Sequence, residues 1–147
     1  MRKLIEDVKI TNAIAPADGV AGVSDINGAI LDMSGFDGVL AIITFGAITS
    51  GAVTSIKMQQ DTAAAMGGAS DLAGTAQTIA DDNDEKTFYI DLSNPGERYV
   101  RLVVDRATQN AVVASAIYVQ YGAKSRATTQ GSNVAGESHD RVAEGTA

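Results

Sequence analysis

The single histidine of the chain, His139, lies between Ser138 and Asp140 near the C-terminus. A serine, a histidine and a carboxylate are the groups that many hydrolases use for nucleophilic catalysis. Such groups act only when a rigid scaffold holds them, and the surrounding segment is rich in Gly, Ser, Thr and Ala. We therefore expect no catalytic residue here. The chain has no cysteine, which excludes thiol catalysis and thiolate metal sites, and a lone histidine argues against other transition-metal sites.

Four carboxylates and one amide follow one another from Asp81 to Glu85. Oxygen ligands of this kind are what Ca²⁺ requires. The run lacks the alternating acidic positions and the central glycine of an EF-hand loop. We expect a solvated turn between strands, so no metal ligand is predicted and calcium removal should leave the melting temperature unchanged.

Paired carboxylates also serve glycoside hydrolysis, and thirteen acids lie between residues 11 and 121. Each of these acids is explained by a turn or by the solvated face of a strand. A carbohydrate-binding platform needs aromatic rings, and the chain has four Tyr and no Trp. The sequence contains neither a GxGxxG motif nor a Walker-type phosphate loop, so no cofactor is expected.

Three arginines, Arg98, Arg101 and Arg106, fall within one predicted strand and the turn after it. One interpretation is cross-strand pairing with nearby acids. The other is contact with a neighbouring subunit, because arginine is enriched at protein interfaces. Charge reversal at Arg101 separates the two, since only a subunit contact predicts a changed oligomeric state without a loss of monomer stability.

The net charge of −7 is distributed unevenly over the 147 residues. Residues 11–121 hold thirteen acids and five bases, a net charge of −8, whereas both ends are close to neutral. Without clustered Lys and Arg, nucleic-acid binding is not expected. No segment reaches the roughly 18 apolar residues of a membrane span, and early acids argue against a secretory signal. We expect a soluble protein made in a cytoplasm, with no membrane partner.

Segments that are apolar or alternate with a period of two predict the strands. They cover residues 26–33, 39–45, 52–60, 87–92, 98–105 and 111–121. The uninterrupted apolar run 39–45 is typical of a strand buried on both faces. In the last strand, one side is expected to carry Val113, Ile117, Val119 and Tyr121. Residues 61–84 predict a long loop.

No amphipathic helix of three or more turns is present, so the pattern predicts an all-β protein. We expect an antiparallel β-sandwich or a jelly-roll-like barrel of six to seven or more strands. Residues 16–122 would form this body. Residues 1–15 predict an edge strand or an arm that lies on a neighbour, and residues 123–147 predict a low-complexity tail. The tail is either mobile or ordered only against another subunit.

Several short motifs occur in a fixed order between residues 25 and 122. An Asp-x-x-Gly-aromatic-Asp turn precedes the central strand and consists of Asp32, Gly35, Phe36 and Asp37. A Gly-x-Arg-Tyr-hydrophobic-Arg strand comes late and contains Gly96, Arg98, Tyr99 and Arg101. The segments Ile56–Asp61 and Leu72–Thr75 lie between them. In this order the chain resembles small structural proteins of tailed bacteriophages and prophages that sit on the head as decoration or cement proteins.

The resemblance implies a β-rich shell component without enzymatic activity. Its partners would be the major capsid protein and copies of itself, as a dimer or trimer. It would lie on the outer surface of the capsid after synthesis in the bacterial cytoplasm. The tail after Gly122 departs from the family pattern, in which the chain usually stops soon after the last strand.

We expect the contacts with a partner to come from the N-terminal arm, the loop 61–84 and the tail. The arm would dock through its apolar side chains, Leu4, Ile5, Val8 and Ile10. Arg98 and Arg101 are the other candidate interface residues. If the arm instead completes the sheet of the body, deleting residues 1–10 should lower the melting temperature.

Two other functions remain open at this stage. The chain could be another part of a virion, a head–tail connector or a tail component, which predicts low copy number or self-assembly into rings or tubes. It could also be a free ligand- or carbohydrate-binding β-sandwich, which predicts a monomer with an exposed tyrosine cluster.

Overall fold

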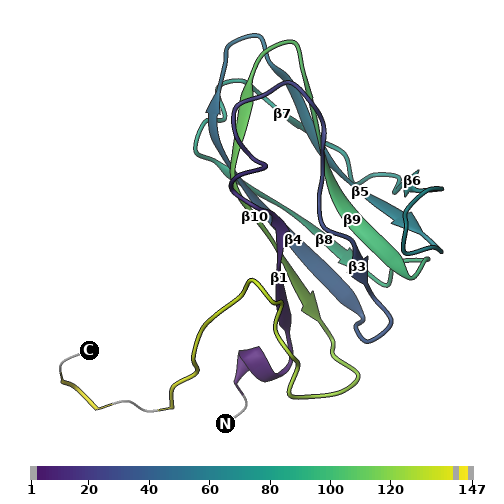
Figure 1. Cartoon of the computed structure of the whole chain (residues 1–147), viewed down its shortest axis with the longest axis vertical. Helices are drawn as coiled ribbons and strands as arrows, with labels where there is room; N and C mark the ends of the chain where they lie inside the picture. The colour runs from purple at the N-terminus through teal and green to yellow at the C-terminus, as the bar shows by residue number, and fades with distance from the viewer. Residues whose placement is uncertain (1–2, 141–142, 146–147) are drawn as a thin grey trace.

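The computed structural model describes residues 3–140 and 143–145, and it contains two antiparallel sheets packed face to face (Figure 1). The four-stranded sheet consists, in spatial order, of β1 (Lys9–Ile14), β10 (Ala111–Tyr121), β4 (Gly38–Ile48) and β8 (Thr87–Ser93). The six-stranded sheet has the order β2 (Ile26–Asn27), β9 (Tyr99–Ala107), β5 (Val53–Asp61) and β6 (Ser70–Asp71), with β3 (Leu31–Asp32) also on β9 and β7 (Gln77–Ile79) also on β5. The predicted antiparallel β-sandwich is confirmed.

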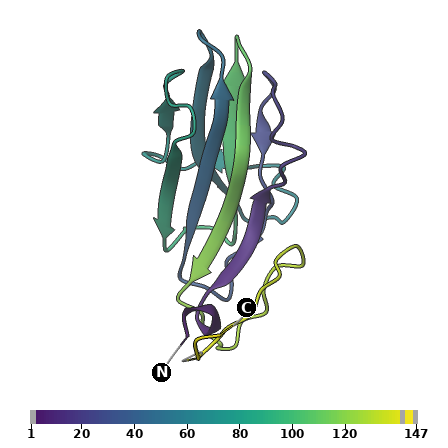
Figure 2. The same cartoon turned by 90° about the vertical axis from the view of Figure 1, so that its left-hand side faces the viewer.

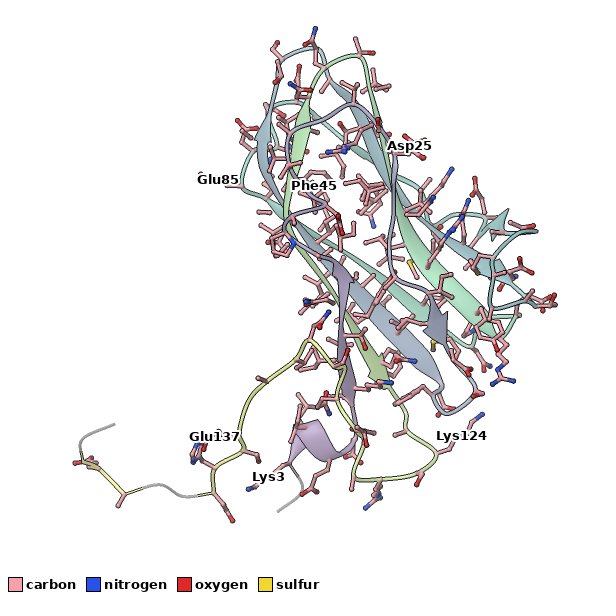
Figure 3. All side chains as sticks on the ribbon, viewed as in Figure 1. Lys3, Asp25, Phe45, Glu85, Lys124 and Glu137 are labelled. Carbon is pink, nitrogen blue, oxygen red and sulfur yellow. The ribbon has the colours of Figure 1, made fainter. Side chains whose placement is uncertain are left out.

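The core lies between the two sheets, where the alternating apolar side chains meet. In β5, Thr54, Ile56 and Met58 are buried while their neighbours are more exposed, as the period of two predicts. Phe45 of β4 is fully buried and meets Phe88 edge to face, with ring centroids 5.9 Å apart. Figure 3 shows Phe45 between the sheets, whereas Glu85 and Lys124 point outward.

The prediction that one side of β10 carries Val113 together with Ile117, Val119 and Tyr121 is wrong. The pairing of β10 with β4 shifts register on both sides of Val113. Such a bulge adds a residue to one strand and reverses which side chains face inward. Consequently Ala116, Tyr118 and Gln120 are buried, while the apolar Ile117 and Val119 are only half-buried on the outer face.

The strand expected over residues 26–33 is divided into β2 and β3, which both pair with β9. Between them the backbone of Gly28 approaches the opposite sheet so closely that a Cβ there would lie 2.7 Å from the Tyr118 hydroxyl oxygen. The Gly28 amide also donates to the Leu102 carbonyl at 2.7 Å. The glycine therefore marks a close approach, which interrupts the strand.

Residues 61–84 also contain more order than a loop, because β6 and β7 both pair with β5. Asp61 closes the turn before β6, where its carboxylate accepts hydrogen bonds from the amides of Ala63 and Gly68. These hydrogen bonds lower the pKa of Asp61.

The N-terminal segment and the tail lie together at one end of the sandwich (Figure 2). A 3-10 helix, η1 (Leu4–Glu6), leads into β1, which pairs with β10 and forms an edge of the chain's own sheet. The tail then returns along this edge: the Gly131 amide donates to the Ile10 carbonyl at 2.9 Å. Within residues 3–140 and 143–145, no helix is long and apolar enough to cross a membrane.

Candidate contact surface

The outer face of the four-stranded sheet carries several half-buried apolar side chains and one exposed tyrosine. Strand register aligns two central rows across all four strands. One row contains Ile10, Val119, Leu40 and Asp91, and the next contains Asn12, Ile117, Ile42 and Tyr89. We call these two rows the apolar face. Tyr89 is 66% exposed, and Leu40, Ile42, Ile117 and Val119 are half-buried.

The apolar face is almost uncharged, although the chain as a whole carries −7. Asp91 is the one charged residue in its two rows. The Tyr121 hydroxyl donates to the Asp91 carboxylate at 2.6 Å, which raises the pKa of Tyr121 to about 12. Depletion of charge together with apolar and aromatic side chains is characteristic of the centre of protein interfaces.

The outer face of the six-stranded sheet has the opposite character. Lys57 forms ion pairs with Asp71 at 3.0 Å and Asp105 at 3.3 Å, and these pairs raise the pKa of Lys57. Arg101 donates to the side chain of Gln59 at 2.9 Å on the same face. Polar side chains that form ion pairs and hydrogen bonds with one another suit a face in contact with water. The two sides of the sandwich therefore differ in what they can bind.

The candidate arginines take part in cross-strand contacts of this polar sheet. Arg98 binds the Asp32 carboxylate with two nitrogens, Nε at 3.0 Å and Nη2 at 2.7 Å. The hydrogen bonds from Arg98 hold the pKa of Asp32 well below its usual range. This pair joins the two motifs of the sequence, since Asp32 in β3 lies opposite Tyr99 in β9. A role of Arg98 and Arg101 in subunit contact stays a prediction.

The apolar side chains predicted for the arm are divided between two environments. Val8 is buried and Ile10 belongs to β1, so both contribute to the chain's own fold. Leu4 is 76% exposed and Ile5 is half-buried, and these two remain accessible to a partner. The arm and the arginines are not brought together: they lie on different sheets.

The acidic run 81–85 lies in a turn, where two of its carboxylates accept hydrogen bonds from backbone amides. The carboxylate of Asp81 accepts from the Gly51 amide and that of Asp84 from the Ile48 amide, both at 2.7 Å. In the described part of the chain, no three His, Cys, Asp or Glu side chains are grouped as metal ligands. His139 is exposed and lies 3.4 Å from the Glu137 carboxylate.

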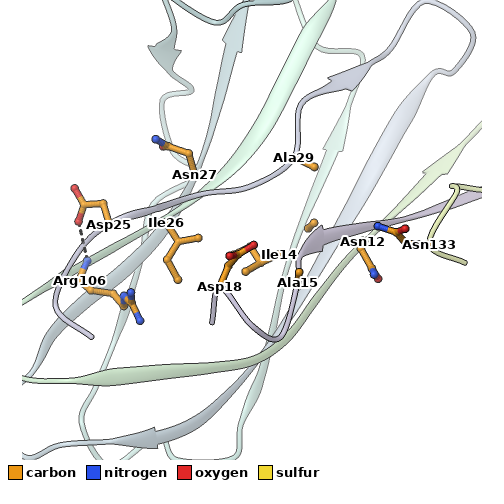
Figure 4. A pocket seen from close by; sticks show the side chains of 11 residues that line it. Asn12, Ile14, Ala15, Asp18, Asp25, Ile26, Asn27, Ala29, Arg106 and Asn133 are labelled. Atoms are coloured by element: carbon orange, nitrogen blue, oxygen red, sulfur yellow. Dashed lines mark hydrogen bonds between the residues drawn. The ribbon is translucent and has the colours of Figure 1, made fainter. Parts of the chain in front are cut away.

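A cavity of about 500 Å³ opens between the end of β1 and β2, and its lining includes Asp18, Asp25 and Arg106 (Figure 4). The guanidinium of Arg106 is committed to backbone: it donates to the carbonyls of Val20, Ser24 and Ala111 at 2.7–2.8 Å. Burial lowers the pKa of Arg106. Arg106 therefore anchors residues 20–25 across the open side of the sandwich and offers no free cation to a ligand.

A smaller cavity of about 350 Å³ lies where the two sequence motifs meet, beside Phe36, Gly96 and Arg98. Acidic Asp37 and Glu97 share its lining with basic Arg98 and Lys124. Because the lining contains both acidic and basic side chains, it favours neither an anionic nor a cationic ligand.

Sequence reasoning did not identify the apolar face. Two signals point to it: the uninterrupted apolar run 39–45, and a last strand with apolar residues on both of its faces. Only the β10 bulge places Ile117 and Val119 beside Leu40 and Ile42.

No protein-family model matches the chain, and no curated protein matches its sequence. Among solved structures, the chain is similar to the SPBc2 prophage-derived protein YomS, with 15% sequence identity and a TM-score of 0.49. The match covers 82% of this chain and 97% of that chain. A similarity of this degree carries no argument about function.

Proposed function

We propose that this chain is a non-enzymatic structural protein of a phage virion, which binds the assembled capsid shell as a decoration or cement protein. The apolar face is the surface that would lie on the shell. The observation that carries the proposal is the contrast between this nearly uncharged face and the polar, ion-paired face on the other side of the sandwich.

The rest of the molecule supports a binding role. Its body is braced across the core, because the Tyr118 hydroxyl of one sheet bonds the Leu102 amide of the other at 2.7 Å. A rigid body loses little conformational freedom on binding. The net charge of −7 would keep many copies soluble before assembly, since net charge away from zero opposes self-association.

Co-sedimentation with undecorated phage heads tests this function. We expect saturable binding, with a copy number commensurate with the capsid lattice and little binding to unassembled coat subunits. A few copies per particle would instead indicate a connector or tail component, and no binding would contradict the proposed shell-binding role.

A further inference from the structure

Strand β8 leaves one edge of the four-stranded sheet open. The opposite edge, β1, is covered by the tail, where Gln130 Oε1 accepts the Ile10 amide at 2.7 Å. The outermost strands of the six-stranded sheet are only two or three residues long. β8 is seven residues long, and no strand in the described part of the chain pairs with its outer side. Proteins usually shorten, cover or charge such edges, because open edges pair with other strands.

The register shows which backbone groups are open. Hydrogen-bonded and non-hydrogen-bonded residue pairs alternate along an antiparallel ladder. Phe45 and Lys86 form a hydrogen-bonded pair, because the Phe45 amide donates to the Lys86 carbonyl. Counted from this pair, the residues of β8 that bond to β4 are Phe88, Ile90 and Leu92. The backbone groups of Thr87, Tyr89, Asp91 and Ser93 therefore point outward. Among the described residues, one side chain reaches this edge: Gln77 Nε2 donates to the Tyr89 carbonyl at 2.8 Å.

The side chains of β8 give this edge little protection, and Asp91 is its one charged side chain. The strand contains no proline and no lysine, its pairing with β4 shows no bulge, and its inward-facing residues are apolar. Phe88 and Leu92 are only partly buried at the rim of the core. A further strand beside β8 would cover the partly exposed side chains of Phe88 and Leu92 and would form hydrogen bonds with the open amides.

The strand is complementary to itself when it is paired antiparallel about Ile90. Thr87 then lies opposite Ser93 and Tyr89 opposite Asp91, so every outward-pointing residue meets another outward-pointing residue. Four such pairs give about eight hydrogen bonds. The neighbouring registers are less favourable. Pairing centred on Asp91 would place the two Asp91 carboxylates opposite each other, where they repel. Pairing centred on Tyr89 would leave Ser93 without a partner residue in the other strand.

We propose that two copies of this chain join edge to edge through β8, in antiparallel pairing centred on Ile90. The two four-stranded sheets become one eight-stranded sheet around a two-fold axis, and each copy uses the same surface. On pairing, the hydrogen bond from the Gln77 side chain to the Tyr89 carbonyl is either broken or shared with an amide of the partner strand.

The pairing does not depend on shell binding. It does place the apolar faces of both copies on the same side, because residues opposite each other in an antiparallel pair share a face. If the proposed function holds, the dimer would dock with two such faces at once and gain avidity.

Asp91→Pro tests the pairing, because proline removes an outward amide and places its ring where the partner strand must lie. The matched control is Asp91→Val, which also loses the carboxylate that Tyr121 contacts but keeps the amide. By sedimentation velocity we expect the wild type and Asp91→Val to be dimers, and Asp91→Pro to dissociate at least tenfold more readily. Far-UV circular dichroism and melting confirm that Asp91→Pro is folded.

A cysteine crosslink tests the register without relying on proline. The natural chain has no cysteine, so Ile90→Cys introduces a single thiol. Opposite residues of a non-hydrogen-bonded pair are close enough for a disulfide, so mild oxidation should give a covalent dimer. Leu92→Cys is the control, since its two thiols would be roughly 13 Å apart along the strands.

A wild type that stays monomeric over a roughly hundredfold concentration range would overturn the pairing. An assembly that Asp91→Pro leaves intact, or one that Leu92→Cys crosslinks as well as Ile90→Cys, would also overturn it. None of these results bears on shell binding, which the co-sedimentation measures separately.

Discussion

Tyr118 joins the two sheets through its hydroxyl group. The fully buried oxygen accepts from the Leu102 amide at 2.7 Å and donates to the Ala29 carbonyl at 2.9 Å. Burial raises the pKa of this hydroxyl well above its ordinary value. A tyrosine in the core is therefore satisfied by backbone groups of the opposite layer, and it explains why Gly28 cannot carry a side chain.

Tyr118→Phe should lower the free energy of unfolding by about 1–3 kcal/mol, because it leaves the buried Leu102 amide without a partner. Urea denaturation measures the change. Tyr99→Phe, on the outer side of β9, is the control and should have little effect. A loss below about 0.5 kcal/mol for Tyr118→Phe would contradict the bridging role.

Gly28→Ala should destabilise the protein through the same contact. The new Cβ would lie 2.7 Å from the Tyr118 oxygen and 2.8 Å from the Leu102 carbonyl oxygen, so the loop between β2 and β3 must move. Thermal melting should show a clear decrease, whereas Gly35→Ala, where nothing lies within 4 Å of the Cβ position, should melt close to the wild type. Equal melting temperatures for the two variants would refute the close approach.

The Asp32–Arg98 pair predicts a pH dependence of stability. The pKa of Asp32 is lower in the folded chain than in the unfolded one, so its contribution is present above the ordinary value of about 3.9 and is lost as the pH falls further. Asp32→Asn should therefore flatten the decline in unfolding free energy below about pH 4. Arg98→Gln should flatten it as well, because it removes the donor. A decline as steep as that of the wild type in both variants would show that the pair is not formed.

At the scale of elements, the strands with clean alternation were predictable from sequence. β5, β8 and β9 match the predicted ranges to within two residues at each end. Their alternation also identifies the buried face, because a period of two leaves one choice when one side is polar. β1, which lies within residues 1–15, pairs with β10 at the edge of the four-stranded sheet.

Three features of the elements depend on contacts between distant residues and could not be predicted. The β10 bulge reverses the inward face in a strand where both sides carry apolar residues, so alternation gave no warning. The break at Gly28 depends on Tyr118, which is 90 positions away in the sequence. The course of the tail depends on polar groups of Gln130 and Thr128 that meet the backbone of residues 5–10.

The tail contact gives a prediction at this scale. The Gln130 side chain accepts the Ile10 amide and donates to the Val8 carbonyl at 2.9 Å, so it closes the β1 edge. Gln130→Ala should accelerate hydrogen exchange of the Ile10 amide by about tenfold or more, as the edge opens locally. Thr129→Ala, whose side chain is exposed, should not. Unchanged Ile10 protection in Gln130→Ala would show that the tail does not cover this edge.

At the scale of the whole molecule, the sandwich has two sides of different chemistry. One sheet presents ion pairs and hydrogen-bonded polar side chains, and the other presents two rows of apolar residues with one carboxylate. Neither composition nor net charge reveals this division, because both average over the two faces. The division separates a side suited to docking from a side suited to solvent, which is what the proposed shell binding requires.

The most direct test of this account compares the same substitution on the two faces. Ile42→Lys places a charge at the centre of the apolar face, and Val53→Lys places it at a 63% exposed position of the other sheet. Binding of both variants to undecorated heads is measured by co-sedimentation, after melting confirms that each is folded. We expect Ile42→Lys to weaken binding at least tenfold, about 1.4 kcal/mol, and Val53→Lys to bind like the wild type. Undiminished binding by folded Ile42→Lys would contradict the assignment of the apolar face as the docking surface.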